Sequence, residues 1–123
     1  MKKVEYGFYK LDVWKLGMSI VNEIYSMTKN FPNDEKFCLV AQIRRSAISV
    51  PLNIAEGSAK RTNKDFANFI RIALGSLMET MTCIEISLEQ KYINKEIYDR
   101  LSQIIQEEYF KLIALDKFLA KGN

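Results

Sequence analysis

Histidine is absent from the 123 residues of this chain. This removes the side chain that most often serves as general acid or base near neutral pH, and it excludes zinc sites built on imidazole. It also excludes the di-iron centres of helical bundles, which need inward Glu-x-x-His pairs. Carboxylate-only metal sites stay open, although Glu56 and Glu79 are the only acids expected to face inward. We therefore expect no cofactor and no enzymatic activity.

Cysteine, proline and long apolar runs are also scarce, with two cysteines and two prolines in the chain. No apolar run approaches the ~18 residues of a membrane span, and the first residues lack the apolar core of a signal peptide. Cys38 and Cys83 lie inside helical apolar patterns. We expect reduced, packed thiols in a cytoplasmic protein, with a disulfide between two helices as the alternative.

Apolar residues recur at helical spacing in four segments, and strand-type alternation is absent. The predicted helices run from about Asp12 to Thr28, from Asn33 or Asp34 to about Glu56, from Thr62 to about Lys91, and from Asn94 to near the C-terminus. Gly57 is expected to cap the second helix, Thr62 with Asp65 the third, and Asn94 the fourth. Short connections favour antiparallel neighbours, so residues 1–123 are predicted to form one all-α, up-down-up-down four-helix bundle.

The second predicted helix carries an unusual polar stripe within the segment QIRRSAISVPLNIAEG. Polar residues, most of them small and uncharged, recur along it at spacings of four, three, four and three, namely Gln42, Ser46, Ser49, Asn53 and Glu56. Beside them runs an apolar stripe, so this helix is predicted to contact protein on more than one side. Both this stripe and the wide apolar surface of the fourth helix suggest a subunit interface.

Two adjacent arginines in this helix, Arg44 and Arg45, point about 100° apart. One of them can face solvent or a partner while the other faces the bundle. We predict that Arg45 pairs with Glu79 or Glu56, within the chain or across subunits. The alternative is an ordinary exposed arginine.

Together these residues resemble a known family. The central motif comprises Gln42, Arg44, Arg45, Ser49, Asn53 and Ala55-Glu56-Gly57, with flanking matches at Leu11-Asp12-Val13-Trp14, Phe31-Pro32, Phe66, Phe69, Gly75-Ser76 and Glu79. Over roughly residues 8 to 119 the chain is similar to the four-helix-bundle proteins named after 23S rRNA intervening sequences. The resemblance implies a ring-shaped homopentamer. The family also resembles the accessory variability protein of diversity-generating retroelements, a basic pentamer that works with a reverse transcriptase and RNA.

Positive charge concentrates around the second connection, because residues 44–71 hold six basic and two acidic residues in a chain of net charge +3. Arg44, Lys60, Arg61, Lys64 and Arg71 are the candidates for contact with RNA or DNA phosphates. A ring would repeat them as a basic rim; the alternative is a solvated helix end. The low net charge also keeps open a protein–protein adaptor that presents apolar and acidic surface to an unidentified protein.

Overall fold

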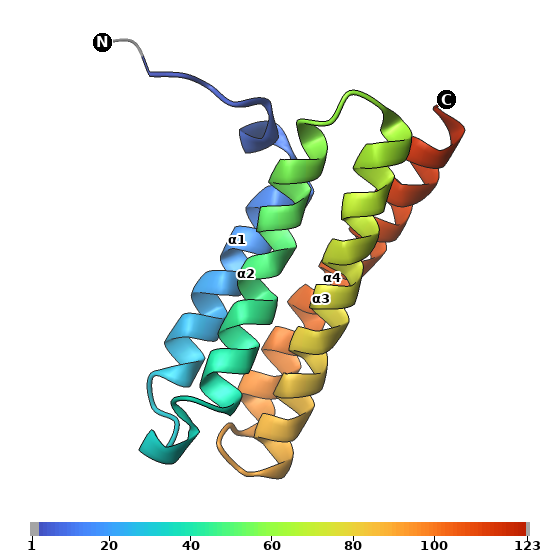
Figure 1. Cartoon of the computed structure of the whole chain (residues 1–123). Coiled ribbons are helices and arrows are strands. Elements are labelled where there is room, and N and C mark those ends of the chain that lie inside the picture. Colours follow the sequence, from blue (N-terminus) through green and yellow to red (C-terminus); the bar gives the residue numbers. More distant parts are fainter. Residues whose placement is uncertain (1–2, 123) are drawn as a thin grey trace.

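The fold consists of four long helices and two short 3-10 turns in a computed structural model that describes residues 3–122. The helices are α1 (Asp12–Thr28), α2 (Leu39–Ser58), α3 (Asn63–Glu89) and α4 (Lys95–Lys121), and the turns are η1 (Gly7–Lys10) and η2 (Asn33–Glu35). No strand occurs within these residues. The predicted all-α four-helix bundle is therefore confirmed (Figure 1).

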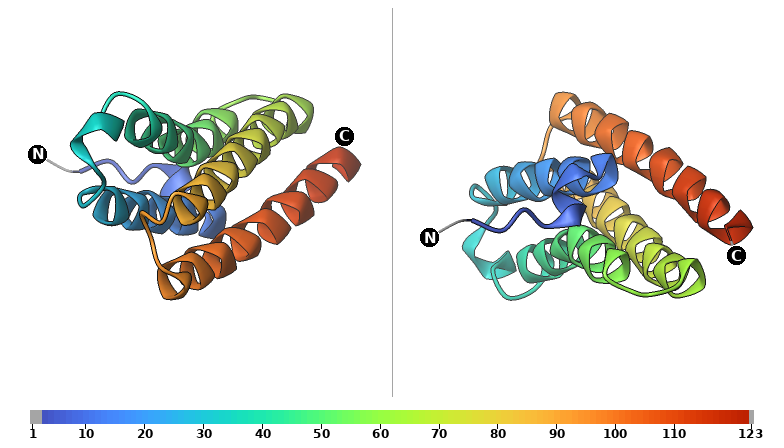
Figure 2. Two further views of the ribbon diagram at one scale, coloured as in Figure 1. Left: turned by 90° about the horizontal axis from the view of Figure 1, so that it is seen from below. Right: turned by 90° about the horizontal axis from the view of Figure 1, so that it is seen from above.

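The helices lie side by side, and each packs on two others: α2 and α4 both contact α1 and α3. Figure 1 shows the α1–α2 and α3–α4 connections at one end and the α2–α3 connection at the other. The views along the bundle in Figure 2 show the four helices around a shared centre. The end of α4 lies beside the start of α3, where the Asn63 side-chain amide donates to the Gly122 carbonyl oxygen at 3.2 Å.

Branched aliphatic side chains fill the centre of the bundle. Each of the four helices supplies some of the largest fully buried ones, namely Ile20, Ile24, Ile43, Ile54, Ile70, Leu77, Ile84, Leu101, Ile105 and Leu112. Burial of one such side chain stabilises the fold by about 1.5–3 kcal/mol, so this core is the main source of stability. No helix within residues 3–122 has an apolar stretch long enough to cross a membrane.

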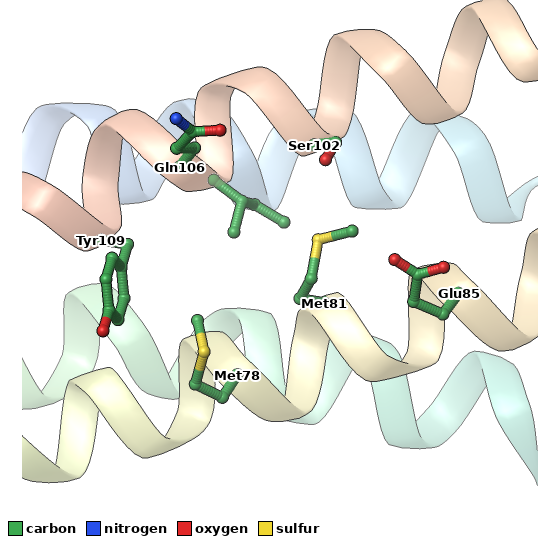
Figure 3. A pocket seen from close by; sticks show the side chains of 7 residues that line it. Met78, Met81, Glu85, Ser102, Gln106 and Tyr109 are labelled. Atoms are coloured by element: carbon green, nitrogen blue, oxygen red, sulfur yellow. The ribbon is translucent and has the colours of Figure 1, made fainter.

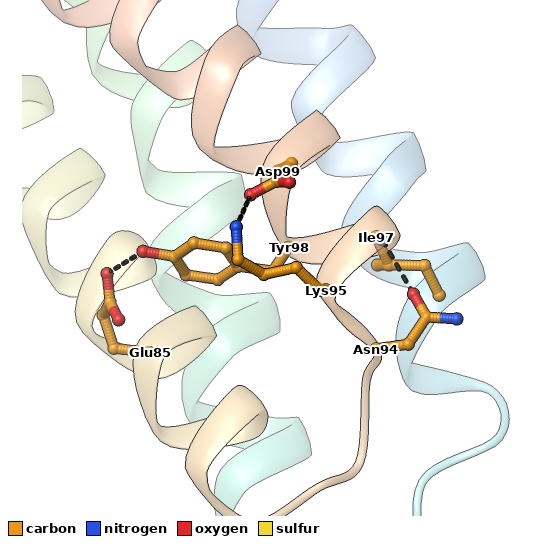
Figure 4. A network of polar contacts seen from close by, with 6 residues as sticks. All are labelled: Glu85, Asn94, Lys95, Ile97, Tyr98 and Asp99. Carbon is orange, nitrogen blue, oxygen red and sulfur yellow. Dashed lines mark hydrogen bonds and ion pairs between the residues drawn. The ribbon is translucent and has the colours of Figure 1, made fainter.

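Local side-chain chemistry starts two of the helices as predicted. The Thr62 hydroxyl oxygen accepts from the Asp65 backbone N–H at 3.1 Å at the start of α3. The Asn94 side-chain oxygen accepts from the Ile97 N–H at 2.9 Å at the start of α4 (Figure 4). Both caps satisfy amides that the first turn of a helix leaves without a backbone partner.

Two predicted features of α2 are wrong. The helix begins at Leu39, because Asn33–Glu35 forms a 3-10 turn and the Glu35 carboxylate accepts from the Leu39 N–H at 3.3 Å. Gly57 is not the cap but a buried residue inside the helix, and no described glycine has a positive φ. A Cβ at Gly57 would lie 2.6 Å from Cβ of Phe69, so this glycine permits close contact between α2 and α3.

The two cysteines occupy different environments. Cys83 is buried in α3, where burial raises the pKa of its thiol and the nearby Glu79 carboxylate raises it further. Cys38 is exposed at the start of α2, so its predicted burial is wrong. Both thiols are free, and no disulfide joins the two helices.

Candidate nucleic-acid interface

The polar stripe of α2 meets a matching polar stripe on α3 within the same chain. The Gln42 side-chain amide donates to the Glu79 carboxylate near one end of this contact. One turn along α2, the Ser46 and Thr80 hydroxyl groups are 2.8 Å apart, and both residues are buried. A hydroxyl pair in a buried position satisfies polarity that would otherwise cost free energy.

The same seam continues toward the α2–α3 connection. The Ser49 and Ser76 hydroxyl groups are 2.8 Å apart. The Asn53 amide donates to the Ser49 backbone oxygen at 2.8 Å and to its hydroxyl oxygen at 2.9 Å. Ser46 and Ser49 are therefore accounted for by contact between α2 and α3 in one chain, and Asn53 by hydrogen bonds within α2. They no longer support a subunit interface by themselves.

Arg45 and Glu56 stand apart from this seam. Both are exposed, and no ion pair within residues 3–122 includes either of them. A buried Arg45 pair is therefore not formed within the chain; pairing across subunits stays a prediction.

Arg44 is the arginine that turns toward the bundle. Its Nε donates to the Thr28 hydroxyl oxygen at 2.9 Å, and its guanidinium carbon lies 4.4 Å from the centre of the Tyr25 ring.

Three exposed basic side chains gather at the α2–α3 connection, namely Lys60, Arg61 and Lys64. The ammonium group of Lys60 lies 5.0 Å from the centre of the Phe69 ring, which anchors its stem on α3. No ion pair joins the three to an acid in the described part of the chain. They surround the start of α3, where the helix dipole is positive. We call this surface the basic end.

The final turns of α4 extend the basic end, which sequence reasoning missed. Because Gly122 contacts Asn63, the exposed lysines Lys117 and Lys121 lie near the start of α3. Arg71 lies further along α3 and pairs with Asp116 of α4 at 3.2 Å, so an acid partly neutralises its charge. The bundle topology was the signal that could have found these lysines, because it places the C-terminus at this end.

Arg44 does not share the basic end. Lys60 follows the last residue of α2, Ser58, which lies 14 positions after Arg44, or about 21 Å along the helix. The five predicted phosphate contacts therefore divide into Lys60, Arg61, Lys64 and Arg71 toward one end and Arg44 toward the other.

A buried acid, Glu108, was not predicted. Its side chain is fully buried, and neither carboxyl oxygen has a hydrogen-bond partner in residues 3–122. Burial raises the pKa of Glu108 to about 8, with Lys111 opposing and Glu107 reinforcing the shift.

Glu56 and Glu79 are both exposed, so the expectation that they are the inward acids is wrong. No group of three or more potential metal-ligating His, Cys, Asp or Glu side chains comes together in the described residues.

Two apolar grooves mark different faces of the bundle. One, of about 310 Å³, lies between α3 and α4 and is lined by Met78, Met81, Ile105 and Tyr109 with polar groups around them (Figure 3). The other, of about 280 Å³, lies over α1 and α2 beside η1, where the exposed side chain of Leu52 stands next to Pro51.

Taken together, the four-helix bundle, the α2–α3 seam and the basic end define a small all-α protein with one positively charged end. The sequence profile of the family described as 23S rRNA-intervening sequence protein matches residues 9–114, and the chain belongs to this family. The resemblance inferred from the motif around Gln42–Gly57 is thereby confirmed.

A solved structure supports the same fold. The chain is similar to a protein of unknown function from the S23 ribosomal protein family of Bacteroides thetaiotaomicron, whose crystal structure was determined at 1.70 Å. The two are 29% identical, and the match covers 85% of this chain and 98% of that one, with a TM-score of 0.79. No curated protein matches the chain.

Proposed function

We propose that this protein is a non-enzymatic, cytoplasmic, homo-oligomeric protein that binds RNA or DNA phosphates through its basic end. One observation carries the proposal: Lys60, Arg61 and Lys64 are exposed together at the start of α3, and no ion pair engages them within residues 3–122. Lys117 and Lys121 add charge beside them. The family name, which refers to an rRNA intervening sequence, agrees with this direction.

The chemistry of the basic end suits phosphate rather than base recognition. Lysine and arginine neutralise phosphates and release condensed counterions, and a helix start adds a positive dipole. Contacts to phosphates fix position on a nucleic acid but carry no sequence information. The proposed binding is therefore tolerant of sequence and sensitive to salt.

We propose further that the antiparallel bundle is one subunit of a ring. Support comes from the two apolar grooves, which lie on different faces of the bundle. If one face of a subunit binds a different face of the next, the interface is head-to-tail, and such interfaces form a ring when the rotation between neighbours closes. Five subunits follow from the family resemblance. A ring would repeat the basic end around its axis, so that a modest charge per chain becomes a strong local field.

A second candidate is an oligomeric adaptor for another protein. It is favoured by two large exposed aromatic side chains, Phe37 at 88% and Phe118 at 68% exposed. Such side chains are enriched in protein interfaces. A complex recovered from cells that survives nuclease and high salt would favour the adaptor, whereas one dominated by RNA that salt removes would favour the first candidate.

The proposal is tested by binding of a labelled structured RNA to the purified chain, with two matched variants. The first changes Lys60, Arg61 and Lys64 to Gln. The second changes Lys15, Lys91 and Lys95 to Gln and removes the same charge elsewhere on the bundle, outside every proposed phosphate site. We expect the first variant to lose most of the affinity at low salt and the second to retain it.

Equal loss in both variants would show that net charge alone attracts RNA, and the basic end would have no special role. Absence of RNA binding by the unaltered protein at low salt would overturn the proposal. Circular dichroism and oligomer mass of both variants establish that the substitutions have not changed the fold or assembly.

A further inference from the structure

A separate concave site lies between the end of α1 and the start of α2, far from the basic end. This pocket has a volume of about 340 Å³ and is lined by Thr28, Lys29, Asn33, Lys36, Val40 and Arg44, with Phe31 and Pro32 beneath. Its lining includes three cations and no acid. Its size lies at the lower end of ligand sites, which run from about 300 to 1,000 Å³. The pocket therefore suits a small anion.

Arg44 is the best-positioned cation of the pocket. Its Nε is held by the Thr28 hydroxyl oxygen at 2.9 Å, and its guanidinium group stacks over the Tyr25 ring at 4.4 Å. The Thr28 hydroxyl in turn donates to the Ile24 carbonyl oxygen at 2.8 Å, which fixes the acceptor that Arg44 uses. Since only Nε is committed in these contacts, the terminal nitrogens are left to bind an anion in the forked geometry that phosphate and carboxylate prefer.

The surroundings add to this charge. Val40 belongs to the first turn of α2, which brings the positive end of a helix dipole to the pocket. Asn33 contributes an amide that can donate a hydrogen bond. Two features oppose binding: α1 ends here with its negative pole, and two acids, Asp34 and Glu35, lie in the adjacent turn. The three cations of the pocket outnumber these two acids.

The pocket also has apolar walls. Val40 is 8% exposed and Phe31 is 9% exposed, so both are held rigidly by the core below. An anion with a small apolar group could therefore place its charge at Arg44 and its carbon atoms against these side chains. Such a combination of an apolar surface with a few convergent polar groups is typical of small-molecule sites.

We propose that this pocket binds a small phosphomonoester, with the phosphate held by Arg44, Lys29 and Lys36 and the ester group against Phe31 and Val40. The site is distinct from the basic end and does not depend on RNA binding there. Both a free metabolite and the 5′ end of a nucleic acid can carry a phosphomonoester. Phenyl phosphate and a 5′-phosphorylated oligonucleotide distinguish these two sources.

The test uses phenyl phosphate as the probe and follows the backbone amide resonances of Thr28, Asn33 and Val40 in the full chain. We expect saturable shifts at these amides, with weaker affinity for inorganic phosphate and no saturation with phenol. An oligonucleotide with a 5′-phosphate is compared with the same oligonucleotide lacking it.

Variants locate the binding. Arg44→Gln is expected to weaken phenyl phosphate binding at least about tenfold, equivalent to about 1.4 kcal/mol. Because Arg44 also packs on Tyr25, Lys36→Gln provides a second variant that leaves this packing in place and should weaken binding several-fold. Lys15→Gln, which changes an exposed lysine at the opposite end of α1, is the matched control and should bind normally.

The result that would overturn the proposal is an absence of saturable shifts at the pocket, or shifts that Lys15→Gln and Lys36→Gln reduce equally. Response to both oligonucleotides but not to phenyl phosphate would also overturn it and assign the pocket to a nucleic-acid backbone. The Lys60, Arg61 and Lys64 variant should bind phenyl phosphate normally, so failure of this proposal is separable from failure of the proposed RNA binding.

Discussion

Replacement of the buried Glu108 should change how the stability of the protein depends on pH. The carboxyl group is fully buried without a hydrogen-bond partner in residues 3–122. A Cβ built on Gly17 of α1 would lie 3.2 Å from its Oε2 and 3.5 Å from Pro51 of α2, so the carboxyl group packs against α1 where α1 meets α2. We expect Glu108→Met to stabilise the fold at neutral and alkaline pH, because it fills a similar volume without a charge.

The sign and size follow from the pKa of the group. Its ordinary value of 4.5 rises to about 8 in the folded state, mainly through burial. Below pH 4.5 the carboxyl is neutral in both states, and its contribution to stability is at its greatest. Each pH unit above 4.5 lowers the free energy of unfolding by about 1.4 kcal/mol, until the pH reaches the pKa of the folded state. The free energy of unfolding should therefore fall by about 5 kcal/mol between pH 4.5 and about 8 from this group.

Urea unfolding followed by circular dichroism, from about pH 5 to about pH 9, measures this effect as the difference between the protein and Glu108→Met. Taking the difference cancels the titration of all other carboxyl groups. The advantage of the variant should grow by about 4 kcal/mol across the range and level off above pH 8. Glu108→Gln should remove the pH dependence while keeping a buried polar group. A constant difference between the protein and Glu108→Met would refute the reasoning.

Three further substitutions test the packing and the caps, each by urea unfolding at fixed pH. Gly57→Ala should destabilise by about 1–3 kcal/mol, because its Cβ would meet Cβ of Phe69 at 2.6 Å; no change would show that α2 and α3 separate easily. Asn94→Ala should cost about 1 kcal/mol through loss of the α4 cap, and Asn94→Asp should not. Ser46→Ala should cost about 1 kcal/mol because Thr80 loses a buried partner, whereas a neutral result would mean that this pair adds nothing to the seam.

The helices themselves could be predicted because their signals are local. Apolar residues at helical spacing mark each segment, and Thr62 and Asn94 stand where a side-chain oxygen can satisfy the first amides. The start of α2 could not be placed, because Asn33 and Asp34 suit a helix cap and a 3-10 turn equally well. The choice between them depends on Glu35, whose carboxylate reaches the Leu39 amide.

The inward position of Glu108 was readable but overlooked. Leu101, Ile105, Glu108 and Leu112 follow one another at spacings of four, three and four, so the acid occupies a core position of α4. An acid in such a stripe is easily assigned to the margin of the face, because burial of a carboxylate is costly. Only the three-dimensional packing, with Gly17 of α1 beside its carboxyl group, shows that Glu108 is enclosed.

The candidate site was predicted in part. The sequence identified the polar stripe of α2, but the residues opposite it lie 27 to 37 positions away, and their register depends on how α2 and α3 pack. Local charge pointed to Lys60, Arg61 and Lys64 correctly as an exposed group. Local charge also grouped Arg44 with these residues, because it counts residues that are close in sequence. Arg44 lies near the other end of α2 and is therefore distant from them in space.

The salt dependence of RNA binding tests the central claim most directly. The logarithm of the association constant should fall linearly with the logarithm of salt concentration, and the Lys60, Arg61 and Lys64 to Gln variant should lower the steepness by about 2 to 3. The variant at Lys15, Lys91 and Lys95 should leave the slope unchanged. Identical slopes for the protein and the first variant would contradict the account, because phosphates would then not contact the basic end.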